Sequence, residues 1–282
     1  EVMMIGTFGG YFVLEGLKTI STPTAENPNL NFLNANPLLS ILLAFLVGTA
    51  VASLTGYFLE KIAYRPLRNA PRLVPLISAI GASIFLQNAV QLLFSPQLRD
   101  YTNPDVISRG IGWPIEIAGS QVLITYTGVL SFALSIFLMI GLYVLVQKTR
   151  IGRAMRAVAQ DKKTAALMGV DVDKVISQTF IISGALAGAA GVMWGIHNGL
   201  VYYFLGFVPG IKAFTAAVLG GIGNIPGAMV GGMVLGVVES VGPAVLGIDF
   251  QLKDVIAFLI LVLVLIFRPS GILGTATVEE KL

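Results

Sequence analysis

The stretch VLITYTGVLSFALSIFLMIGLYVLV, residues 122–146, contains no charged side chain. An α-helix rises about 1.5 Å per residue, so about 20 apolar residues cross the roughly 30 Å hydrocarbon core of a bilayer. Membrane-spanning β-strands would instead be segments of about 10 residues with alternating hydrophobicity. The stretch therefore predicts a transmembrane helix from Val122 to Val146.

Six further apolar stretches occur along the chain. They are Val2 to Leu17, Leu38 to Leu59, Leu73 to Phe94, Val175 to Gly195, Ala213 to Leu246 with interruptions, and Val255 to Phe267. The 282 residues are 55% hydrophobic and only 12% charged, whereas about a quarter of the residues in an average soluble domain are charged. We therefore expect an all-α protein, a polytopic bundle of transmembrane helices that forms a single domain over residues 1–282.

The composition excludes several kinds of site. Without Cys the chain has no disulfide or zinc–cysteine site, and its single His excludes a His-cluster metal site within the chain. The net charge of +3 is small, and Lys and Arg gather in particular loops, so we assign no nucleic-acid partner. No residues form a nucleophile–base set, so we expect neither catalytic residues nor a cofactor.

Basic residues indicate the orientation. The connection after Leu59 contains Lys61, Arg65, Arg68 and Arg72. The connection after Val146 contains seven Lys and Arg residues between positions 148 and 174. Loops rich in Lys and Arg remain on the cytoplasmic side of the membrane. The loops Lys18 to Pro37 and Ser95 to Gln121 would then lie outside. The C-terminal tail after Arg268 would be cytoplasmic if Ala213 to Leu246 returns to its starting side.

A glycine-rich break interrupts the stretch from Ala213 to Leu246. The sequence GGIGNIPG, Gly220 to Gly227, predicts a helical hairpin with a short first arm and a longer second arm. Non-helical backbone at membrane depth has to be buried in protein or line a watery cavity. Gly221, Gly223 and Asn224 are therefore candidates for the wall of a translocation path. An ordinary loop at the membrane surface is the alternative.

Polar residues inside the apolar stretches give further path candidates, because such residues are costly in lipid and usually face the bundle interior. Glu239 is either a pathway or gating residue or a structural partner near the outer interface. Gln87, Asn88 and Gln91 share one helix face. They either line the path or form hydrogen bonds between helices.

The basic segment 147–174 is longer than a connection between two spans requires. Asp161 can cap a helix from Lys162 to Met168 that stops at Gly169, and Asp171 can cap the next membrane helix. The segment therefore predicts a short helix between two turns on the cytoplasmic side.

Apolar residues also recur at helical spacing before Asp161. Ala154, Met155 and Val158 stand among the basic residues Arg153 and Arg156. This pattern suits an amphipathic helix that lies in a groove of a partner protein. It equally suits a surface helix whose Lys and Arg side chains reach anionic lipid headgroups.

Several ordered motifs resemble the branched-chain amino acid (LivH-type) permeases of ABC importers. They are GRAMRA at 152–157 leading into QD at 160–161, AALMGV at 165–170, YRPLR at 64–68, LISAIG at 76–81 and GGIGNIPGA at 220–228. The resemblance covers essentially the whole chain. Family members carry further apolar sequence upstream, and Glu1 begins inside an apolar segment without an initiator Met. We therefore expect the N-terminus to be truncated.

The resemblance implies a permease subunit that translocates amino acids, foremost leucine, isoleucine and valine, across the bacterial inner membrane. It implies a heterodimer with a second related permease, two ATP-binding cassette subunits and an extracytoplasmic solute-binding protein. In this family the cytoplasmic loop contacts the ATPase. The corresponding residues here are Arg153, Met155, Arg156, Val158, Asp161, Ala165, Met168 and Gly169.

The energy source and the substrate leave alternatives. The chain contains no Gly-x-x-x-x-Gly-Lys-[Ser/Thr] phosphate loop, so we expect ATP hydrolysis in partner subunits. A secondary transporter driven by an ion gradient is a second hypothesis, because such transporters often contain broken helices. Similar permeases also serve urea and short amides, so a substrate of that kind is a further alternative.

Overall fold

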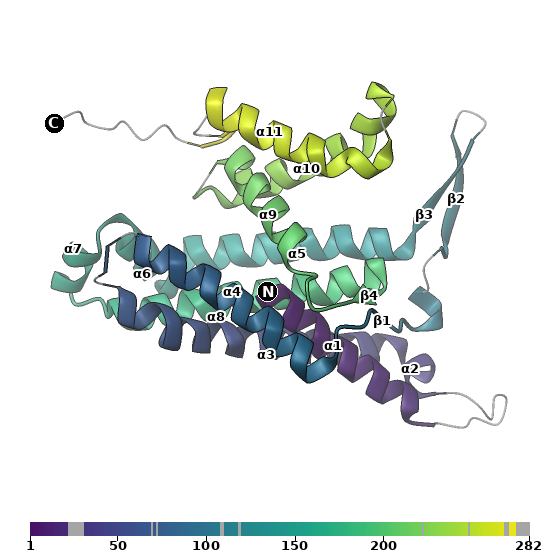
Figure 1. Ribbon diagram of the computed structural model, residues 1–282, viewed down its shortest axis with the longest axis horizontal. Helices are drawn as coiled ribbons and strands as arrows, with labels where there is room; N and C mark the ends of the chain where they lie inside the picture. The colour runs from purple at the N-terminus through teal and green to yellow at the C-terminus, as the bar shows by residue number, and fades with distance from the viewer. Residues whose placement is uncertain are drawn as a thin grey trace. The chain divides into compact units, whose positions relative to one another are not determined.

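The computed structural model describes residues 1–21, 31–68, 70–71, 73–107, 110–117, 120–221, 223–247, 249–267 and 271–274 (Figure 1). Its helices of eleven or more residues are α1 (Val2–Thr19), α3 (Pro37–Leu59), α4 (Leu73–Phe94), α5 (Tyr126–Lys148), α6 (Arg150–Gln160), α8 (Val172–Asn198), α9 (Phe207–Gly220), α10 (Ile225–Leu246) and α11 (Lys253–Phe267). The chain divides into unit 1, Glu1–Leu138 with Thr149–Gly206, and unit 2, Met139–Lys148 with Phe207–Leu282.

Shorter elements connect these helices. They are α2 (Phe32–Ala35), the π-helix η1 (Glu60–Tyr64), the 3₁₀ turns η2 (Arg65–Leu67), η3 (Asp105–Ile107) and η4 (Phe250–Leu252), α7 (Lys162–Leu167), and the strands β1 (Arg99–Asp100), β2 (Gly112–Ile117), β3 (Ser120–Thr125) and β4 (Leu200–Val201). Arg72, Ile222, Arg268 and the tail from residue 275 lie outside the described residues.

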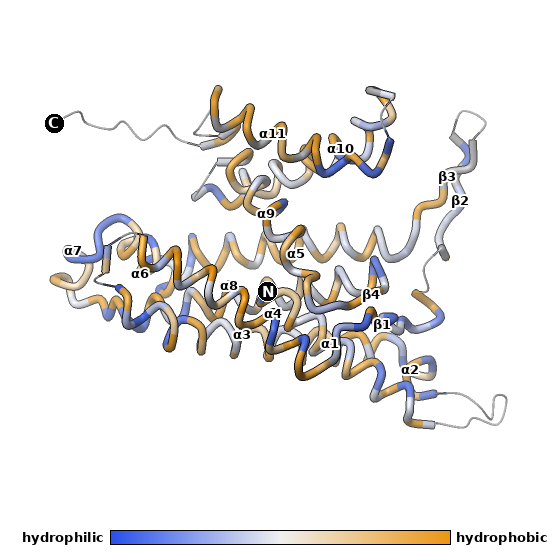
Figure 2. The backbone as a smooth tube through the Cα atoms, viewed as in Figure 1, coloured by the Kyte–Doolittle hydropathy of each residue, from blue (hydrophilic) through white to orange (hydrophobic). Residues whose placement is uncertain are grey.

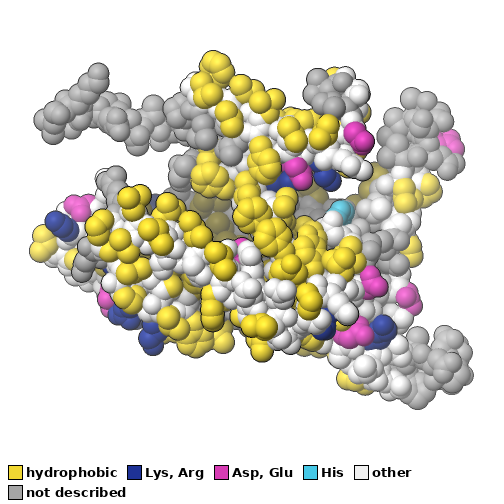
Figure 3. All heavy atoms as spheres, viewed as in Figure 1, with side chains coloured by type: hydrophobic (Ala, Val, Ile, Leu, Met, Phe, Trp, Pro, Cys, Tyr) yellow, Lys and Arg dark blue, Asp and Glu magenta, His cyan; other side chains and the backbone are white. Residues whose placement is uncertain are grey.

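The expected transmembrane helices are present. Among the described residues, five helices are long and apolar enough to cross a membrane: Pro37–Leu67, which joins α3 to η1 and η2, Leu73–Phe94, Tyr126–Lys148, Val172–Asn198 and Ile225–Val245. The other apolar stretches are also helical but shorter, in α1, α9 and α11. Large apolar side chains such as Leu46, Leu54 and Leu76 are exposed along these helices, and Figure 3 shows such side chains on the helices of unit 1. An exposed apolar surface of this kind is suited to lipid.

One predicted boundary is wrong. The prediction had a helix start at Val122, but residues 120–125 form strand β3, which pairs antiparallel with β2 from Gly112↔Thr125 to Ile117↔Ser120. The helix starts at Tyr126 because the hydroxyl Oγ1 of Thr125 accepts a hydrogen bond from the Gly128 N–H at 3.3 Å. A side-chain acceptor of this kind satisfies a free N–H in the first turn.

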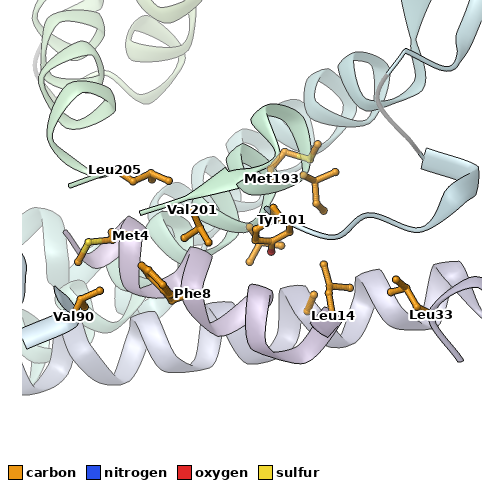
Figure 4. Packing of buried hydrophobic residues seen from close by; sticks show 12 residues of the cluster. Met4, Phe8, Leu14, Leu33, Val90, Tyr101, Met193, Val201 and Leu205 are labelled. Carbon is orange, nitrogen blue, oxygen red and sulfur yellow. The ribbon is translucent and has the colours of Figure 1, made fainter. Parts of the chain in front are cut away.

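The core of unit 1 lies where α1, α3 and α8 pack together. Met4, Phe8 and Leu14 of α1 belong to one buried cluster with residues of α8 and with Tyr101 and Val201, as Figure 4 shows. All of these residues are apolar or aromatic, so this core holds the three helices together largely by close packing of side chains.

Glycines bring these three helices into direct backbone contact. A Cβ atom at Gly188 of α8 would lie 2.7 Å from Gly48 O and Ala52 Cβ of α3. At Gly6 of α1, a Cβ would lie 2.5 Å from the Gly188 Cα. Small residues at such positions allow the close helix approach that stabilises bundles in lipid. Gly184, four residues before Gly188, packs against α3 in the same way, since a Cβ there would lie 2.7 Å from Ala52 O.

The connections after α4 and α8 meet in unit 1. Strand β1, after α4, pairs antiparallel with β4, after α8. The Thr102 hydroxyl donates a hydrogen bond to Glu15 Oε2 in the last part of α1 at 2.8 Å. The ends of α1, α4 and α8 thus lie at one end of unit 1, as alternating passes require.

Unit 2 contains the predicted hairpin. Helices α9 and α10 pack against each other, and α11 packs on both. The contact is close because a Cβ at Gly231 would lie 2.2 Å from Ala216 O, and one at Gly220 would lie 2.0 Å from Gly227 O. The prediction of a short arm and a longer arm is confirmed by the 14 residues of α9 and the 22 residues of α10.

Candidate functional site

The basic segment 147–174 forms a compact helical loop, which we call the 147–174 loop. The Thr149 hydroxyl caps α6 by accepting a hydrogen bond from the Gly152 N–H at 3.0 Å. Asp161 caps α7 through the Lys163 N–H at 2.8 Å, and Asp171 caps α8 through the Lys174 N–H at 3.0 Å. The caps predicted at Asp161 and Asp171 are therefore confirmed. Figure 2 shows the polar residues around α7.

Helix α7 ends in a turn that requires glycine. The Val170 N–H donates to Ala165 O at 3.1 Å and the Gly169 N–H donates to Ala166 O at 3.0 Å. These two bonds form a Schellman motif, which has a left-handed residue after the helix. Gly169 adopts φ = +82° there. The stop predicted at Gly169 is confirmed, although the helix ends at Leu167 and not at Met168.

The apolar face of α6 packs inside the same chain. Val158, Ala165 and Val175 are buried together, and Ala154 and Met155 pack against them. This packing differs from the interpretation in which the apolar residues lie in a partner's groove, whereas the contact of the Lys and Arg side chains with lipid headgroups stays a prediction. The apolar residues are buried because α7 and the start of α8 fold back over α6.

The exposed apolar surface of the loop lies at a different place. Leu167 is 87% exposed and Met168 is 80% exposed, at the tip formed by α7 and its terminal turn. Arg153 and Arg156 on α6 are also exposed. Of the residues assigned to ATPase contact, Val158 and Ala165 thus maintain the shape of the loop, whereas Met168 and the two arginines lie on its surface.

The carboxylate of Asp161 is stabilised in its charged form. Hydrogen bonds from the Thr164 hydroxyl and from the Lys163 and Thr164 N–H groups hold the pKa of Asp161 below its ordinary value. The charged form is favoured because these donors point at the carboxylate oxygens. The cap of α7 is therefore intact at neutral pH.

Charged side chains beside this loop form a cluster that was not predicted from the sequence, although Arg65 and Arg68 were named there for their charge. Arg68 contacts Glu60 and Asp173, Arg65 Nη2 lies 3.1 Å from Asp173 Oδ2, and the Ser177 hydroxyl donates to Glu60 Oε2 at 2.6 Å. Glu60 is completely buried. The signal in the sequence that could have indicated this cluster is Glu60 at the end of an apolar stretch, because a buried carboxylate requires a cation nearby.

The glycine break in unit 2 is a tightly bonded turn. Gly221 and Gly223 adopt φ of +107° and +91°, and Asn224 caps α10 by accepting from the Gly227 N–H at 3.2 Å. The Asn224 side chain also donates to Leu273 O at 2.9 Å. Ile272 N–H donates to Leu219 O at 2.8 Å. The segment 271–274 therefore satisfies backbone groups that the break exposes.

Glu239 belongs to a group of charged residues in unit 2. Lys212 of α9 lies 2.9 Å from Glu239 Oε2 of α10 and 2.7 Å from Asp254 Oδ1 of α11. The other oxygen of Glu239 is buried and accepts no hydrogen bond from the described residues. Lys212 links α9, α10 and α11. Both Lys212 and Asp254 were missed because they lie at the ends of the apolar stretches.

The predicted polar face of α4 is divided between contacts. Gln87 donates to Glu1 Oε1 at 2.8 Å, which links α4 to the start of α1. Asn88 is exposed and donates to Ile84 O of its own helix at 2.7 Å. Gln91 is half-buried. Geometry thus favours an interhelical hydrogen bond at Gln87, one of the two roles left open for it.

Two cavities among the described residues of unit 1 lie away from the predicted path residues of α4. One of about 330 Å³ lies between α1, α5 and α8, beside Met3, Leu134 and Met193. Another of about 390 Å³ lies between α1, α3 and α4, beside Phe8 and Val47. Neither is lined by Gln87, Asn88 or Gln91.

Comparisons with known proteins cover almost the whole chain. Residues 1–265 match the family model described as branched-chain amino acid transport system, permease component. The high-affinity branched-chain amino acid transport system permease protein BraD of Pseudomonas aeruginosa is 44% identical over 280 residues, which are 99% of this chain and 86% of BraD.

Two further relatives are named for the same transport. The high-affinity branched-chain amino acid transport system permease protein LivH of Salmonella typhimurium is 40% identical over 284 residues, and LivH of Escherichia coli K12 is 39% identical over 286 residues. Each alignment covers 99% of this chain and 85% of the relative. No solved structure matches the chain. The matched residues and these identities establish that the chain belongs to the family of permease components of branched-chain amino acid transport systems.

Proposed function

We propose that this chain is the membrane-spanning permease subunit of an ATP-driven importer that carries branched-chain amino acids across the bacterial inner membrane. The observation that supports the proposal most strongly is 39–44% identity to three permeases named for this transport, over 99% of the chain. Five long apolar helices fit a subunit that crosses the membrane several times.

The proposal includes partner subunits. A second related permease would complete a heterodimer, two ATP-binding subunits would lie on the cytoplasmic face, and a soluble binding protein would deliver the amino acid from outside. ATP would be hydrolysed by the partners, because the sequence contains no phosphate-binding loop. The permease itself would catalyse no chemical reaction.

The 147–174 loop would be cytoplasmic and would transmit force from the ATPase. Its seven Lys and Arg residues support this orientation. The exposed side chains of Leu167 and Met168 would contact the ATPase, with Arg153 and Arg156 at the edge of the contact. Asp161, Val158, Ala165 and Gly169 would hold the loop in shape, and Met155 would pack behind it. The C-terminus would be cytoplasmic too.

The translocation path would be formed by conformational change of the helices, in a rigid-body switch between inward-open and outward-open states. The break at Gly221, Gly223 and Asn224 and the polar residues Gln87, Asn88, Gln91 and Glu239 stay candidates for its wall. Their support is their polar or irregular character within predicted spans.

Reconstitution tests the function. The chain is co-expressed with its neighbouring permease, ATPase and binding-protein genes and placed in liposomes with ATP inside or absent. We expect ATP-dependent uptake of labelled leucine that unlabelled isoleucine and valine inhibit and that urea and acetamide do not. Uptake that needs no ATP and is abolished by a proton uncoupler would favour a secondary transporter and refute the proposal. Inhibition by urea or acetamide, without inhibition by isoleucine and valine, would refute branched-chain amino acids as the substrate class.

A further inference from the structure

Two carboxylates and two guanidinium groups join the end of α3 to the start of α8. Arg68 contacts Glu60 through Nη2 and Asp173 through Nη1, so one side chain links both acids. Arg65 Nη2 makes a second contact with Asp173, at 3.1 Å. The four charges balance. Glu60, Arg65 and Arg68 belong to the connection between α3 and α4, whereas Asp173 is in the first turn of α8.

Burial makes part of this cluster costly to break. The Glu60 side chain is 0% exposed and that of Arg68 is 19% exposed, while that of Asp173 is 54% exposed. A buried carboxylate that loses its cation keeps its desolvation penalty. Glu60 therefore holds Arg68 in place, and Arg68 in turn presents its second nitrogen to Asp173. The two helix ends are thus linked through the exposed Asp173 contact and also through the hydrogen bond from Ser177 of α8 to Glu60.

The backbone between Glu60 and Arg68 is shaped for this contact. In a continuous α-helix, residues eight positions apart would be separated by about 12 Å along the axis. Here the π-helix η1 (Glu60–Tyr64) and the 3₁₀ turn η2 (Arg65–Leu67) change the helical geometry, and Arg68 reaches Glu60. Departures from α-helical geometry of this kind are frequent at functional sites.

The exposed tip of the loop lies only a few residues from the cluster along a fixed backbone. From Met168 the chain passes through the Schellman turn at Gly169 and the cap at Asp171 to Asp173. Each of these steps is held by a hydrogen bond at 3.0 to 3.1 Å. A displacement of the tip is therefore transmitted to Asp173, because hydrogen bonds hold the backbone between them in place.

We propose that Glu60, Arg68 and Asp173 form a joint that transmits movement of the 147–174 loop to α3. This inference rests on the proposed function, since the movement would come from the ATPase partner. The three residues are positioning residues and would not touch the transported solute. Because α3 packs on α1 and α8 through glycine contacts, movement of its end would be passed to the core of unit 1.

The experiment separates coupling from assembly in the reconstituted complex. Asp173→Asn removes the exposed charge of the joint and leaves Glu60 paired with Arg68. We expect the complex to assemble with its basal ATP hydrolysis unchanged, while solute transported per ATP falls about fivefold or more, the lower end of typical coupling between sites. Asp173→Glu, which retains the charge, should restore most of the coupling.

Two further variants complete the test. Lys174→Gln is the control, because Lys174 is exposed beside Asp173 and, among the described residues, its side chain takes no part in the cluster. It should leave the ratio of transport to hydrolysis unchanged. Arg65→Gln removes only the outer contact and should lower the ratio less than Asp173→Asn does. If Asp173→Asn prevents assembly, the decrease in Arg65→Gln decides the question.

The outcomes distinguish this inference from the proposed function. A wild-type complex without ATP-driven uptake contradicts the proposed function. A wild-type complex that transports normally, with the same transport per ATP in Asp173→Asn and Arg65→Gln as in Lys174→Gln, overturns the joint alone.

Discussion

Replacing Gly188 with Ala should weaken the packing of α8 on α3. The new Cβ would lie 2.7 Å from Gly48 O and from Ala52 Cβ, and 2.9 Å from the Thr49 Cα. Carbon atoms pack best at about 3.5 to 4.0 Å, so the two helices would have to separate by roughly 1 Å. Most of these neighbours are backbone atoms, and Ala52 has no rotamer to change, so a side-chain rotation cannot relieve the contact.

The expected energy follows from two opposing effects. Overpacking a close contact costs about 1 to 3 kcal/mol, whereas Ala in place of Gly favours a helix by about 1 kcal/mol. Gly81→Ala in α4 is the matched control, because a Cβ there meets no atom within 4 Å. Both variants gain the same helix preference. Gly188→Ala should therefore be less stable than Gly81→Ala by about 1 to 3 kcal/mol.

The measurement is reversible unfolding of the detergent-solubilised protein by sodium dodecyl sulfate, followed by circular dichroism. The two variants are compared with the wild type at the same detergent ratio. Equal unfolding midpoints for Gly188→Ala and Gly81→Ala would show that the helices separate at no cost, which would refute a stabilising role for the close backbone contact at Gly188.

Three further predictions concern the loop and unit 2. Gly169→Ala should speed amide exchange in α7, because a left-handed Ala costs about 1 to 2 kcal/mol; unchanged exchange would contradict the Schellman turn. The folded-state pKa of Asp161 is lowered, so its contribution to the cap is present above its ordinary pKa of about 4 and is lost as pH falls through the folded value. Exchange of the Lys163 amide should rise in that range in the wild type and not in Asp161→Asn. Lys212→Met should destabilise the protein by about 3 kcal/mol, since Glu239 loses its cation, and Lys212→Met with Glu239→Met should recover part of this in thermal melts; no recovery would exclude their pairing as the cause.

Local features of the fold could be predicted from residue types. Long apolar stretches form helices in lipid because the backbone has no other partner there. Caps depend on one side chain and its neighbouring N–H groups, so Asp161 and Asp171 were identified from sequence. The start of α5 was placed too early because residues 120–125 depend on β2, a partner that the apolar composition of Val122 to Val146 does not indicate.

The remaining features depend on partners that are distant in the sequence. The apolar residues of α6 could not be assigned to the chain's own α8 without the turn at Gly169, which brings Val175 beside Val158. The cation for Glu60 is eight residues away and reaches it across η1 and η2, which take the place of regular α-helix. Helical periodicity does not predict such a change, so the charged cluster was missed.

The structure of the 147–174 loop has a consequence for how a partner would act on it. A helix of six residues such as α7 is not stable alone, because helix nucleation is unfavourable. Here its two ends are fixed by the Asp161 cap and the Gly169 turn, and Ala165 is buried against α6 and α8. The exposed tip is thus ordered before any partner binds, which reduces the entropy lost on association. A docking ATPase would therefore displace a preformed lever, and the force would reach Asp173 without first folding the loop.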